Sequence, residues 1–259
     1  MELEGKVAIV TGGGRGIGRA TAKVMAREGA AVTLAARSLD QLRATAGEIQ
    51  GAGGRCIVVE TDVTSEDSVN RMAKETLEAF GTIDILVNNS GIAGPTALCE
   101  ETTIDDWNQT FAVNVIGPFL CCKAVLPVMK AKRWGRVINI SSMSGKRPLV
   151  RRTPYTSSKM AVMGFTRTLA HEVGEFGITV NSVCPGATAG ERIDSVIRNI
   201  AEGEGRSEAE VRADFTGPSA LKSLVNPEDT AEMAAFLASD RAAHMTAQDI
   251  NVTAGLVWY

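Results

Sequence analysis

The chain has 259 residues, of which 44% are hydrophobic and 22% are charged, and its formal net charge is −3 at pH 7. This composition is that of a globular protein and excludes a largely disordered chain. The weak negative charge does not favour a protein that binds nucleic acid or an anionic membrane surface.

The first part of the chain alternates short β-branched runs with longer helical patterns. We expect strands at residues 7–10, 31–36, 55–60 and 83–88. Helices are expected from the first glycine turn to about residue 28, at 38–52 and at 66–80. Ser38 or Asp40 is placed to cap the second helix, and Ser65 is placed to cap the third.

The alternation continues to the end of the chain. One or two long helices are expected at 104–132, further helices at 155–176 and 227–239, and strands at 137–140, 178–183 and 249–252. Strands separated by helices form right-handed crossovers and a parallel sheet. We therefore predict one doubly wound α/β domain, a Rossmann fold, over residues 1–259. The more polar segment 190–226 is either a lid over a pocket or a solvated helix pair.

Cysteine usage and the N-terminus bear on the compartment. No CxxC pair occurs, and no spacing with His171 and His244 suits a metal, so we expect no metal site. Reduced, buried cysteines are expected at Cys56, Cys99, Cys121, Cys122 and Cys184. The N-terminus has no apolar signal core, and no uninterrupted apolar run approaches about 18 residues. These features predict a cytoplasmic protein without a membrane span.

A glycine-rich turn follows the first expected strand and opens the first helix. It reads Thr11-Gly12-Gly13-Gly14-Arg15-Gly16-Ile17-Gly18, with the spacing GxxxGxG. Glycine lets the backbone approach a pyrophosphate, and a helix N-terminus supplies free N–H groups with partial positive charge. The position between a strand and a helix indicates a dinucleotide-binding turn more than a plain connection.

The end of the second strand indicates which dinucleotide binds. Sites selective for NAD place a carboxylate there to bind the adenosine ribose. Here Ala36 stands at that position and is followed by Arg37 and Ser38, while Arg15 lies within the glycine turn. Two arginines without an acid suit the 2′-phosphate of NADP(H). The alternative is that Arg37 is only a solvated residue at a helix start.

Tyr155 and Lys159 stand four residues apart in a helical pattern, so their side chains leave the same helix face. A free tyrosine has a pKa of about 10, and a lysine cation one turn away lowers it. The pair can exchange a proton with a carbinol or carbonyl oxygen. Ser142 follows an expected strand and can hold the same oxygen. Asn114 is a polar residue in an apolar helix, where a buried hydrogen-bonding role and a catalytic role both fit.

In their order along the chain, these motifs resemble those of the short-chain dehydrogenase/reductase family, and the resemblance covers essentially all of the sequence. It extends to Asp62-Val63, Asn88-Asn89-Ser90-Gly91 and Pro185-Gly186. The resemblance implies hydride transfer between the nicotinamide ring and a substrate carbon. It implies that Tyr155 is the acid/base, Ser142 orients the oxygen, Lys159 holds the nicotinamide ribose, and Asn114 supports a water in a proton relay.

The glycine turn, the second strand and the resemblance together define an expected cofactor site. Its residues are Gly12, Gly14, Arg15, Gly16, Ile17, Gly18, Arg37, Ser38, Asp62, Val63, Asn89, Gly91, Tyr155, Lys159, Pro185, Gly186 and Thr188. Two positions depart from the family pattern. Ser90 replaces the usual alanine, and Gly190 stands where a threonine often contacts the carboxamide, so Thr188 is the nearest substitute.

The expected activity is an NADP(H)-dependent reduction of a carbonyl group, or the reverse oxidation of a secondary alcohol. Two substrate types remain open: a small polar or carboxylate-bearing alcohol, and a 3-oxoacyl thioester, as in the 3-oxoacyl-(acyl carrier protein) reductases that the pattern resembles. A non-catalytic NADP-binding regulator is the alternative of another class. The presence of Asn114, Ser142, Tyr155 and Lys159 disfavours it.

The loop between Ser142 and Tyr155 is basic, with Lys146, Arg147 and the Arg151-Arg152 pair and no acid. We expect Arg152, or else Arg151, to bind an anionic group of the substrate, because a guanidinium can bind oxyanions with two hydrogen bonds. The alternative is a solvated or subunit-contact loop.

The resemblance also implies a homotetramer or dimer. Apolar residues expected on the outer faces of the two long helices support it, and they are Phe119, Leu120, Val162 and Phe165. The alternative is that these residues pack within one subunit.

Overall fold

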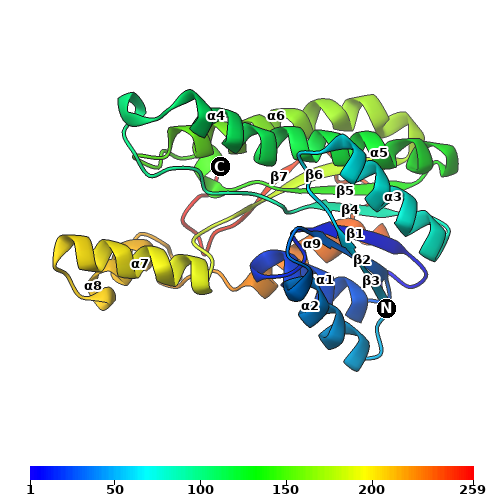
Figure 1. The fold of residues 1–259 in the computed structure, drawn as a ribbon, viewed down its shortest axis with the longest axis horizontal. Coiled ribbons are helices and arrows are strands. Elements are labelled where there is room, and N and C mark those ends of the chain that lie inside the picture. The colour runs from blue at the N-terminus through cyan, green and yellow to red at the C-terminus, as the bar shows by residue number, and fades with distance from the viewer.

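The computed structural model describes the backbone of residues 1–259 and every side chain except those of Arg192 and Asn199. A seven-stranded sheet with the order β3-β2-β1-β4-β5-β6-β7 forms its centre, and each neighbouring pair is parallel (Figure 1). The strands are β1 Val7–Thr11, β2 Ala31–Ala36, β3 Cys56–Glu60, β4 Ile85–Asn88, β5 Gly135–Ile140, β6 Ile178–Pro185 and β7 Asp249–Val252. The predicted doubly wound parallel sheet is confirmed.

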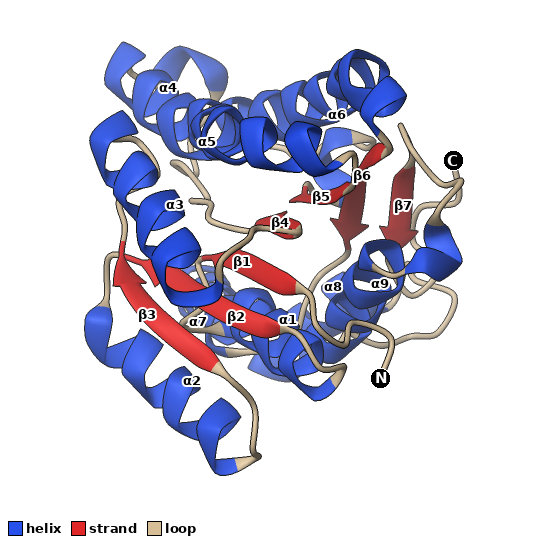
Figure 2. Cartoon of the chain, turned by 90° about the vertical axis from the view of Figure 1, so that its right-hand side faces the viewer, coloured by secondary structure: helices blue, strands red, loops and turns tan.

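Helices cover both faces of this sheet (Figure 2). One face carries α3 Glu66–Phe80, α4 Ile104–Phe111, α5 Gly117–Lys132 and α6 Thr153–Val173, and the other carries α1 Gly16–Arg27, α2 Leu39–Gly51 and α9 Pro227–Ala238. The predicted cap at Ser65 is confirmed, because its hydroxyl accepts the N–H of Ser68. Ser38 is the N-cap residue of α2, but its side chain makes no capping hydrogen bond, and Asp40 lies in the first turn of the helix. The predicted side-chain cap of α2 is therefore wrong.

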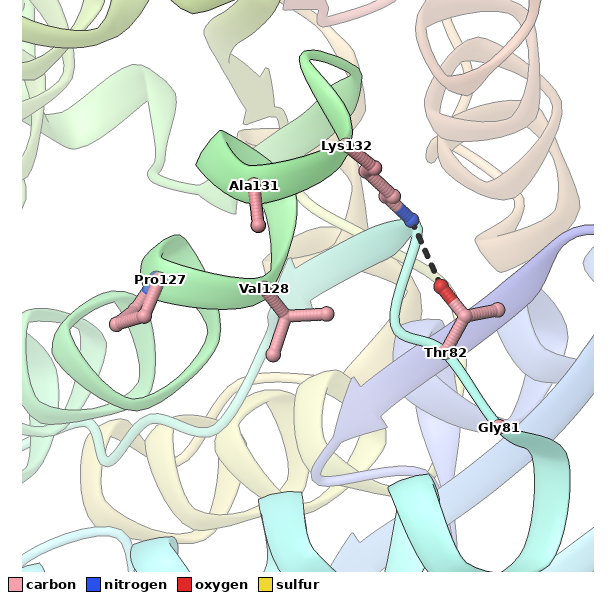
Figure 3. Close-up of a pocket in the computed structure, with 6 residues that line it drawn as sticks. All are labelled: Gly81, Thr82, Pro127, Val128, Ala131 and Lys132. Atoms are coloured by element: carbon pink, nitrogen blue, oxygen red, sulfur yellow. Dashed lines mark hydrogen bonds between the residues drawn. The ribbon is translucent and has the colours of Figure 1, made fainter.

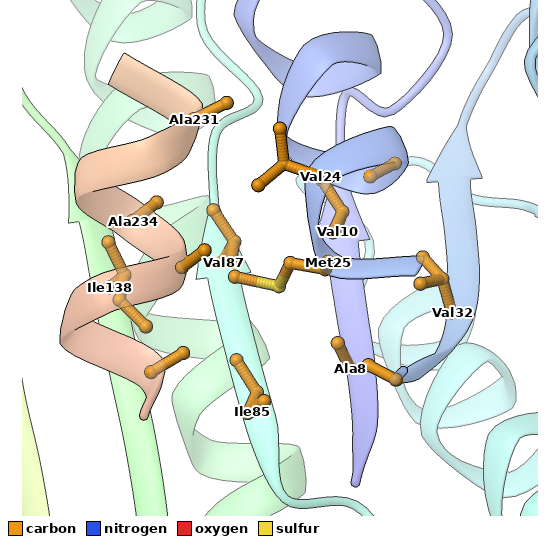
Figure 4. Close-up of a cluster of buried hydrophobic side chains, with 14 of the residues drawn as sticks. Ala8, Val10, Val24, Met25, Val32, Ile85, Val87, Ile138, Ala231 and Ala234 are labelled. Carbon is orange, nitrogen blue, oxygen red and sulfur yellow. The ribbon is translucent and has the colours of Figure 1, made fainter. Parts of the chain in front are cut away.

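The strands are buried on both sides, because each side packs against helices. Ala8 and Val10 of β1 point into the cluster under α1, α2 and α9, whereas Ile9 between them points into the cluster under α3, α5 and α6. In the first cluster, Met25 of α1 faces the small side chains of α9 (Figure 4). Alanines such as Ala234 let α9 approach α1 and the sheet closely, so a core poor in aromatic residues still packs tightly.

The predicted helical region 104–132 forms two helices joined by a π-helical segment, Ala112–Ile116. By length and composition this region is apolar enough to cross a membrane, but core helices of soluble proteins meet the same criterion. Its inner residues, Leu120 among them, are buried in the core, as is Val162 of α6. The prediction that Leu120 and Val162 lie on outer faces is therefore wrong, whereas Phe119 is exposed.

The cysteines differ in their exposure. Cys121, Cys122 and Cys184 are buried, whereas Cys56 is half-buried and Cys99 is exposed. The prediction of buried cysteines is therefore wrong for Cys99. Cys99 lies in the loop between β4 and α4, where a short 3₁₀ turn leaves its side chain outside both clusters.

The strand order reverses between β1 and β4. From β1 the chain builds outward to β2 and β3, and it then returns to place β4 on the other side of β1. Doubly wound proteins bind their ligands at such a switch point, in the crevice outside the carboxyl ends of the strands. The glycine turn, Asn89, Ser142 and Pro185 all lie at these carboxyl ends.

Candidate active site

The glycine turn between β1 and α1 leaves no room for side chains on its inner side. A Cβ atom on Gly18 would lie 2.1 Å from the carbonyl oxygen of Gly12, and one on Gly12 would lie 2.7 Å from Nδ2 of Asn89. Gly12 also has a φ of +65°, which favours glycine. Arg15 is the N-cap residue of α1, and its side chain makes no capping hydrogen bond. The first N–H groups of α1 thus meet a bare turn that fits a pyrophosphate.

The carboxyl ends of β2 and β3 continue this surface. Arg15 and Arg37 are exposed, and neither forms an ion pair with a described side chain. Asp62 follows β3, where its Oδ1 accepts hydrogen bonds from the backbone N–H of Thr64 (2.9 Å) and from the Thr64 hydroxyl (2.7 Å). These two bonds, with a smaller contribution from the charge of Arg37, hold the pKa of Asp62 below its usual value. The surface therefore offers two exposed guanidinium groups.

Asn89 joins the carboxyl ends of β1 and β4. Its Nδ2 donates to the carbonyl oxygens of Thr11 (2.9 Å) and Gly12 (3.2 Å). In return, the Thr11 hydroxyl oxygen accepts the backbone N–H groups of Asn89 (3.0 Å) and Ser90 (3.1 Å). The sequence predicts Asn89 beside the cofactor but not the partnership with Thr11, which rigidifies the switch point.

Asn114 lies within the π-helical segment and is buried. Its Oδ1 accepts the N–H of Ile92 (2.8 Å), and its Nδ2 donates to the carbonyl oxygen of Ile92 and to the Ser158 hydroxyl, both at 3.0 Å. The extra residue of a π turn displaces a side chain from the helical repeat, and such turns are frequent at functional sites. The buried hydrogen-bonding role of Asn114 is therefore observed, and its catalytic role stays a prediction.

Tyr155 and Lys159 leave the same face of α6, as the sequence predicts. Lys159 is buried, and its Nζ donates to the carbonyl oxygen of Ile140 (2.8 Å) and lies 5.8 Å from the centroid of the Tyr155 ring. A Cβ atom on Gly91 would lie 3.6 Å from Nζ of Lys159 and 3.3 Å from Oδ1 of Asn114. The structure thus brings together four predicted site residues, which are Gly91, Asn114, Tyr155 and Lys159.

Ser142 follows β5 at the edge of this group. Its hydroxyl is buried and accepts the N–H of Ser144 (3.1 Å), which begins a 3₁₀ turn at Met143–Gly145. That turn packs on α6, since a Cβ atom on Gly145 would lie 3.1 Å from the carbonyl carbon of Lys159. The sequence reasoning missed Ser141, whose hydroxyl donates to the carbonyl oxygen of Lys159 (2.8 Å). The end of β5 is therefore bonded directly to the helix that carries the Tyr–Lys pair.

A polar ladder beneath the site was also missed. Asn88 Nδ2 donates to Oδ1 of Asn139, and Asn139 Nδ2 donates to the hydroxyl of Thr166, both over 2.8 Å. All three residues are buried. The ladder links β4, β5 and α6, so it fixes the helix that carries Tyr155 and Lys159 against the sheet. Asparagines inside expected apolar strands are the signal that could have revealed it, because buried amides must find hydrogen-bond partners.

The loop after β6 leads to a separate helical hairpin. Thr188 donates from its hydroxyl to the carbonyl oxygen of Gly186 (3.1 Å) and pairs with Val225 in an isolated parallel bridge. Beyond it, α7 Glu191–Glu204 and α8 Glu208–Thr216 project from the carboxyl edge of the sheet (Figure 1). Their own small apolar cluster consists of Ile197, Ala201 and Val211, with Ile193, Ile200 and Phe215 packed around it.

A depression of about 620 Å³ lies at the opposite edge of the sheet, between the loop before β4 and the end of α5 (Figure 3). Among its described lining residues, Lys132 is the charged one. Its Nζ donates to the Thr82 hydroxyl (3.0 Å), the carbonyl oxygen of Ile83 (2.7 Å) and the Asp84 carboxylate. Burial lowers the pKa of Lys132, and Asp84 opposes that effect. These bonds hold the loop before β4, so Lys132 has a structural role.

A doubly wound sheet that joins a bare glycine turn to a Tyr–Lys pair defines a nucleotide-dependent oxidoreductase. The family model described as short chain dehydrogenase matches residues 6–200. The chain is 37% identical over 259 residues to a 3-oxoacyl-(acyl-carrier-protein) reductase of Synechocystis sp.. The aligned region covers 99% of each protein.

Two solved structures share the fold. An actinorhodin polyketide ketoreductase with NADPH has a TM-score of 0.94 and 35% identity, with 98% of each chain covered. An NAD⁺-bound xylitol dehydrogenase has a TM-score of 0.93 and 28% identity, with 98% of this chain and 100% of that chain covered. The protein belongs to the short-chain dehydrogenase family and is an oxidoreductase.

Proposed function

We propose that the protein is an NADP(H)-dependent oxidoreductase that interconverts a carbonyl compound and a secondary alcohol. The convergence of Asn114, Tyr155 and Lys159 around Gly91, at the same sheet edge as the glycine turn, carries this proposal. Bound NADP(H) would exchange a hydride with the substrate carbon at this edge. The glycine turn and the first N–H groups of α1 would hold its pyrophosphate.

The protein side chains would move the proton. In the reductive direction, the Tyr155 hydroxyl donates its proton to the substrate oxygen, and the Ser142 hydroxyl donates a hydrogen bond to the same oxygen. Lys159 stabilises the phenolate that remains on Tyr155 and binds the nicotinamide ribose. Asn114 holds the backbone at Ile92 and supports the water through which the phenolate regains a proton.

The preference for NADP(H) rests on Arg15 and Arg37. Both are exposed at the carboxyl ends of β1 and β2, and the 2′-phosphate of the adenosine ribose supplies the anion that they lack. The actinorhodin ketoreductase was solved with NADPH, which supports this choice, whereas the xylitol dehydrogenase was solved with NAD⁺.

The substrate would be a small carbonyl compound, either neutral or anionic. Residues 1–259 would form one domain in which residues 190–226, with α7 and α8, act as the lid. A 3-oxoacyl thioester is the second candidate substrate, and the Synechocystis relative supports it.

A cytoplasmic homotetramer or dimer is the proposed assembly. Exposed apolar side chains at the start of α5 and on α6 support association: Ile116 ends the π-helical segment, Phe119 lies on α5, and Met160 lies on α6.

The test is turnover measured with NADPH and with NADH against oxoacyl thioesters, 2-ketoacids and neutral ketones, and with NADP⁺ against secondary alcohols. We expect NADPH oxidation with one substrate class and a higher kcat/KM for NADPH than for NADH. Tight NADPH binding without turnover of any class would favour the non-catalytic regulator instead.

A further inference from the structure

Arg152 immediately precedes α6 and reaches across to the loop that follows β4. Its Nη1 donates to the Thr96 hydroxyl (2.8 Å), and its Nη2 donates to the carbonyl oxygen of Ala93 (3.0 Å). The two acceptors are three residues apart, so the planar guanidinium bridges one turn of that loop. The planar guanidinium fixes the spacing and direction of its two donors, which the ammonium group of a lysine does not.

The bridged loop is held by further contacts on both sides of this turn. Ile92 is bonded through both its N–H and its carbonyl group to Asn114, which is bonded in turn to Ser158 of α6. Further along, the N–H of Ala97 donates to the carbonyl oxygen of Arg151 (3.0 Å). Residues 92–97 are therefore tied to α6 or to its entry at Ile92, at the Arg152 bridge and at Ala97.

Tyr155 lies between the points of α6 to which the loop is tied. The guanidinium carbon of Arg152 stands 5.6 Å from the centroid of the Tyr155 ring. The guanidinium therefore touches both the loop, at Ala93 and Thr96, and the neighbourhood of the Tyr155 ring. Gly94 has a φ of +62°, and a Cβ atom on it would lie 2.8 Å from Oγ1 of Thr110, so the loop turns tightly there and packs against α4.

We propose that Arg152 is a positioning residue that holds residues 93–97 as the wall beside Tyr155, and that this wall orients the substrate for proton transfer. This deepens the proposed function and rests on it. The role does not depend on a charge in the substrate, because Arg152 acts through two hydrogen bonds to the loop. It therefore predicts equal dependence on Arg152 for neutral and for anionic ketones.

The first test needs no turnover. Hydrogen exchange is measured on peptides covering residues 92–98 in the wild-type protein and in the Arg152→Lys, Arg152→Gln and Arg147→Gln variants. The Arg147→Gln variant is the control, since this substitution also removes one positive charge from the same loop. We expect roughly tenfold faster exchange in both Arg152 variants than in the wild type, and an unchanged exchange rate in the Arg147→Gln control. Unchanged exchange in both Arg152 variants would overturn the proposal.

The second test separates wall positioning from direct capture of an anion. Acetoacetate and ethyl acetoacetate share the reacting ketone, but only the first carries a carboxylate. We expect KM for both to rise roughly tenfold in Arg152→Lys and Arg152→Gln, with the NADPH dissociation constant unchanged. If only the KM for acetoacetate rose, and lysine restored it, Arg152 would bind the substrate directly and the proposal would be wrong. If the wild-type protein reduced neither ketone, the proposed function would be at fault for this substrate class, while the exchange experiment would still decide the role of Arg152.

Discussion

The Gly18 Cα stands directly against the carbonyl group of Gly12, so closely that a Cβ atom there would lie 2.1 Å from the oxygen. Real Cβ atoms do not approach backbone oxygen this closely, and the backbone of the turn cannot yield without moving β1. We expect Gly18→Ala to lower the unfolding free energy by about 1–3 kcal/mol. It should also abolish NADPH binding, and urea unfolding and fluorescence titration measure the two effects.

A second glycine supplies the control for this experiment. Gly47 lies in the exposed middle of α2, and a Cβ atom there would meet no atom within 4 Å. Gly47→Ala should stabilise the protein by about 0.5–1 kcal/mol, because alanine loses less conformational entropy in a helix. If Gly18→Ala behaved like Gly47→Ala, the turn would be looser than the structure requires.

Replacing the Tyr155 phenol tests the proposed acid/base role. The chain has two tyrosines, so Tyr155→Phe can be compared with Tyr259→Phe. We expect Tyr155→Phe to reduce turnover by roughly 100-fold or more while NADPH binding stays near that of the wild type. Tyr259→Phe should leave kcat unchanged, because its hydroxyl contacts only the carbonyl oxygen of Lys146 among its described partners. Near-normal turnover by Tyr155→Phe would refute the assignment.

Cofactor choice is tested at the end of β2. Arg37→Asp should weaken NADPH binding at least about tenfold, because the carboxylate repels the 2′-phosphate and the charge-assisted bond is lost. NADH binding should improve, since the new carboxylate can accept a ribose hydroxyl. Arg43→Asp, on the exposed side of α2, is the matched control and should change neither affinity. A wild-type protein that already preferred NADH would contradict this interpretation.

Thiol reactivity follows from the burial of the cysteines. Burial raises the pKa of Cys56, Cys121, Cys122 and Cys184, so these thiols stay protonated and react slowly. We expect one rapid equivalent with Ellman's reagent at pH 8, from the exposed Cys99, and five equivalents after denaturation. The Cys99→Ser variant should lose the rapid phase. A rapid phase of two or more equivalents in the native protein would contradict the expected slow reaction of the other four thiols.

Most strands could be predicted because each is a short β-branched run between turn residues. β2 and β7 have their predicted bounds. β4 begins at Ile85, two residues later than predicted, and Asp84 just before it is bonded through its side chain as well as its backbone. Its Oδ2 accepts the N–H of Val7 over 2.8 Å, and its Oδ1 is paired with Lys132. This pairing joins residues far apart in the chain, which local periodicity does not reveal.

The site was predictable at the level of residue types and less so at the level of contacts. The four-residue spacing of Tyr155 and Lys159 places them on one helix face whatever the rest of the chain does. The π turn at Asn114 was not predictable, because the apolar pattern runs through it without a break. Its extra residue is stabilised by bonds to Ile92 and Ser158, and those bonds exist only after α4, α5 and α6 have packed. The same holds for the bridge from Arg152 to Ala93.

The α7–α8 hairpin has an apolar centre of its own and joins the sheet through two adjacent chain segments near Ala187 and Val225. None of its described side chains belongs to either cluster that stabilises the strands. The hairpin is therefore an exchangeable module: if it is the lid of the proposed function, insertions, deletions or a transplanted sequence within α7 and α8 would change the cover of the crevice with little effect on the free energy of unfolding of the sheet. Substrate range can diversify in such a protein while the scaffold that carries out the chemistry remains the same.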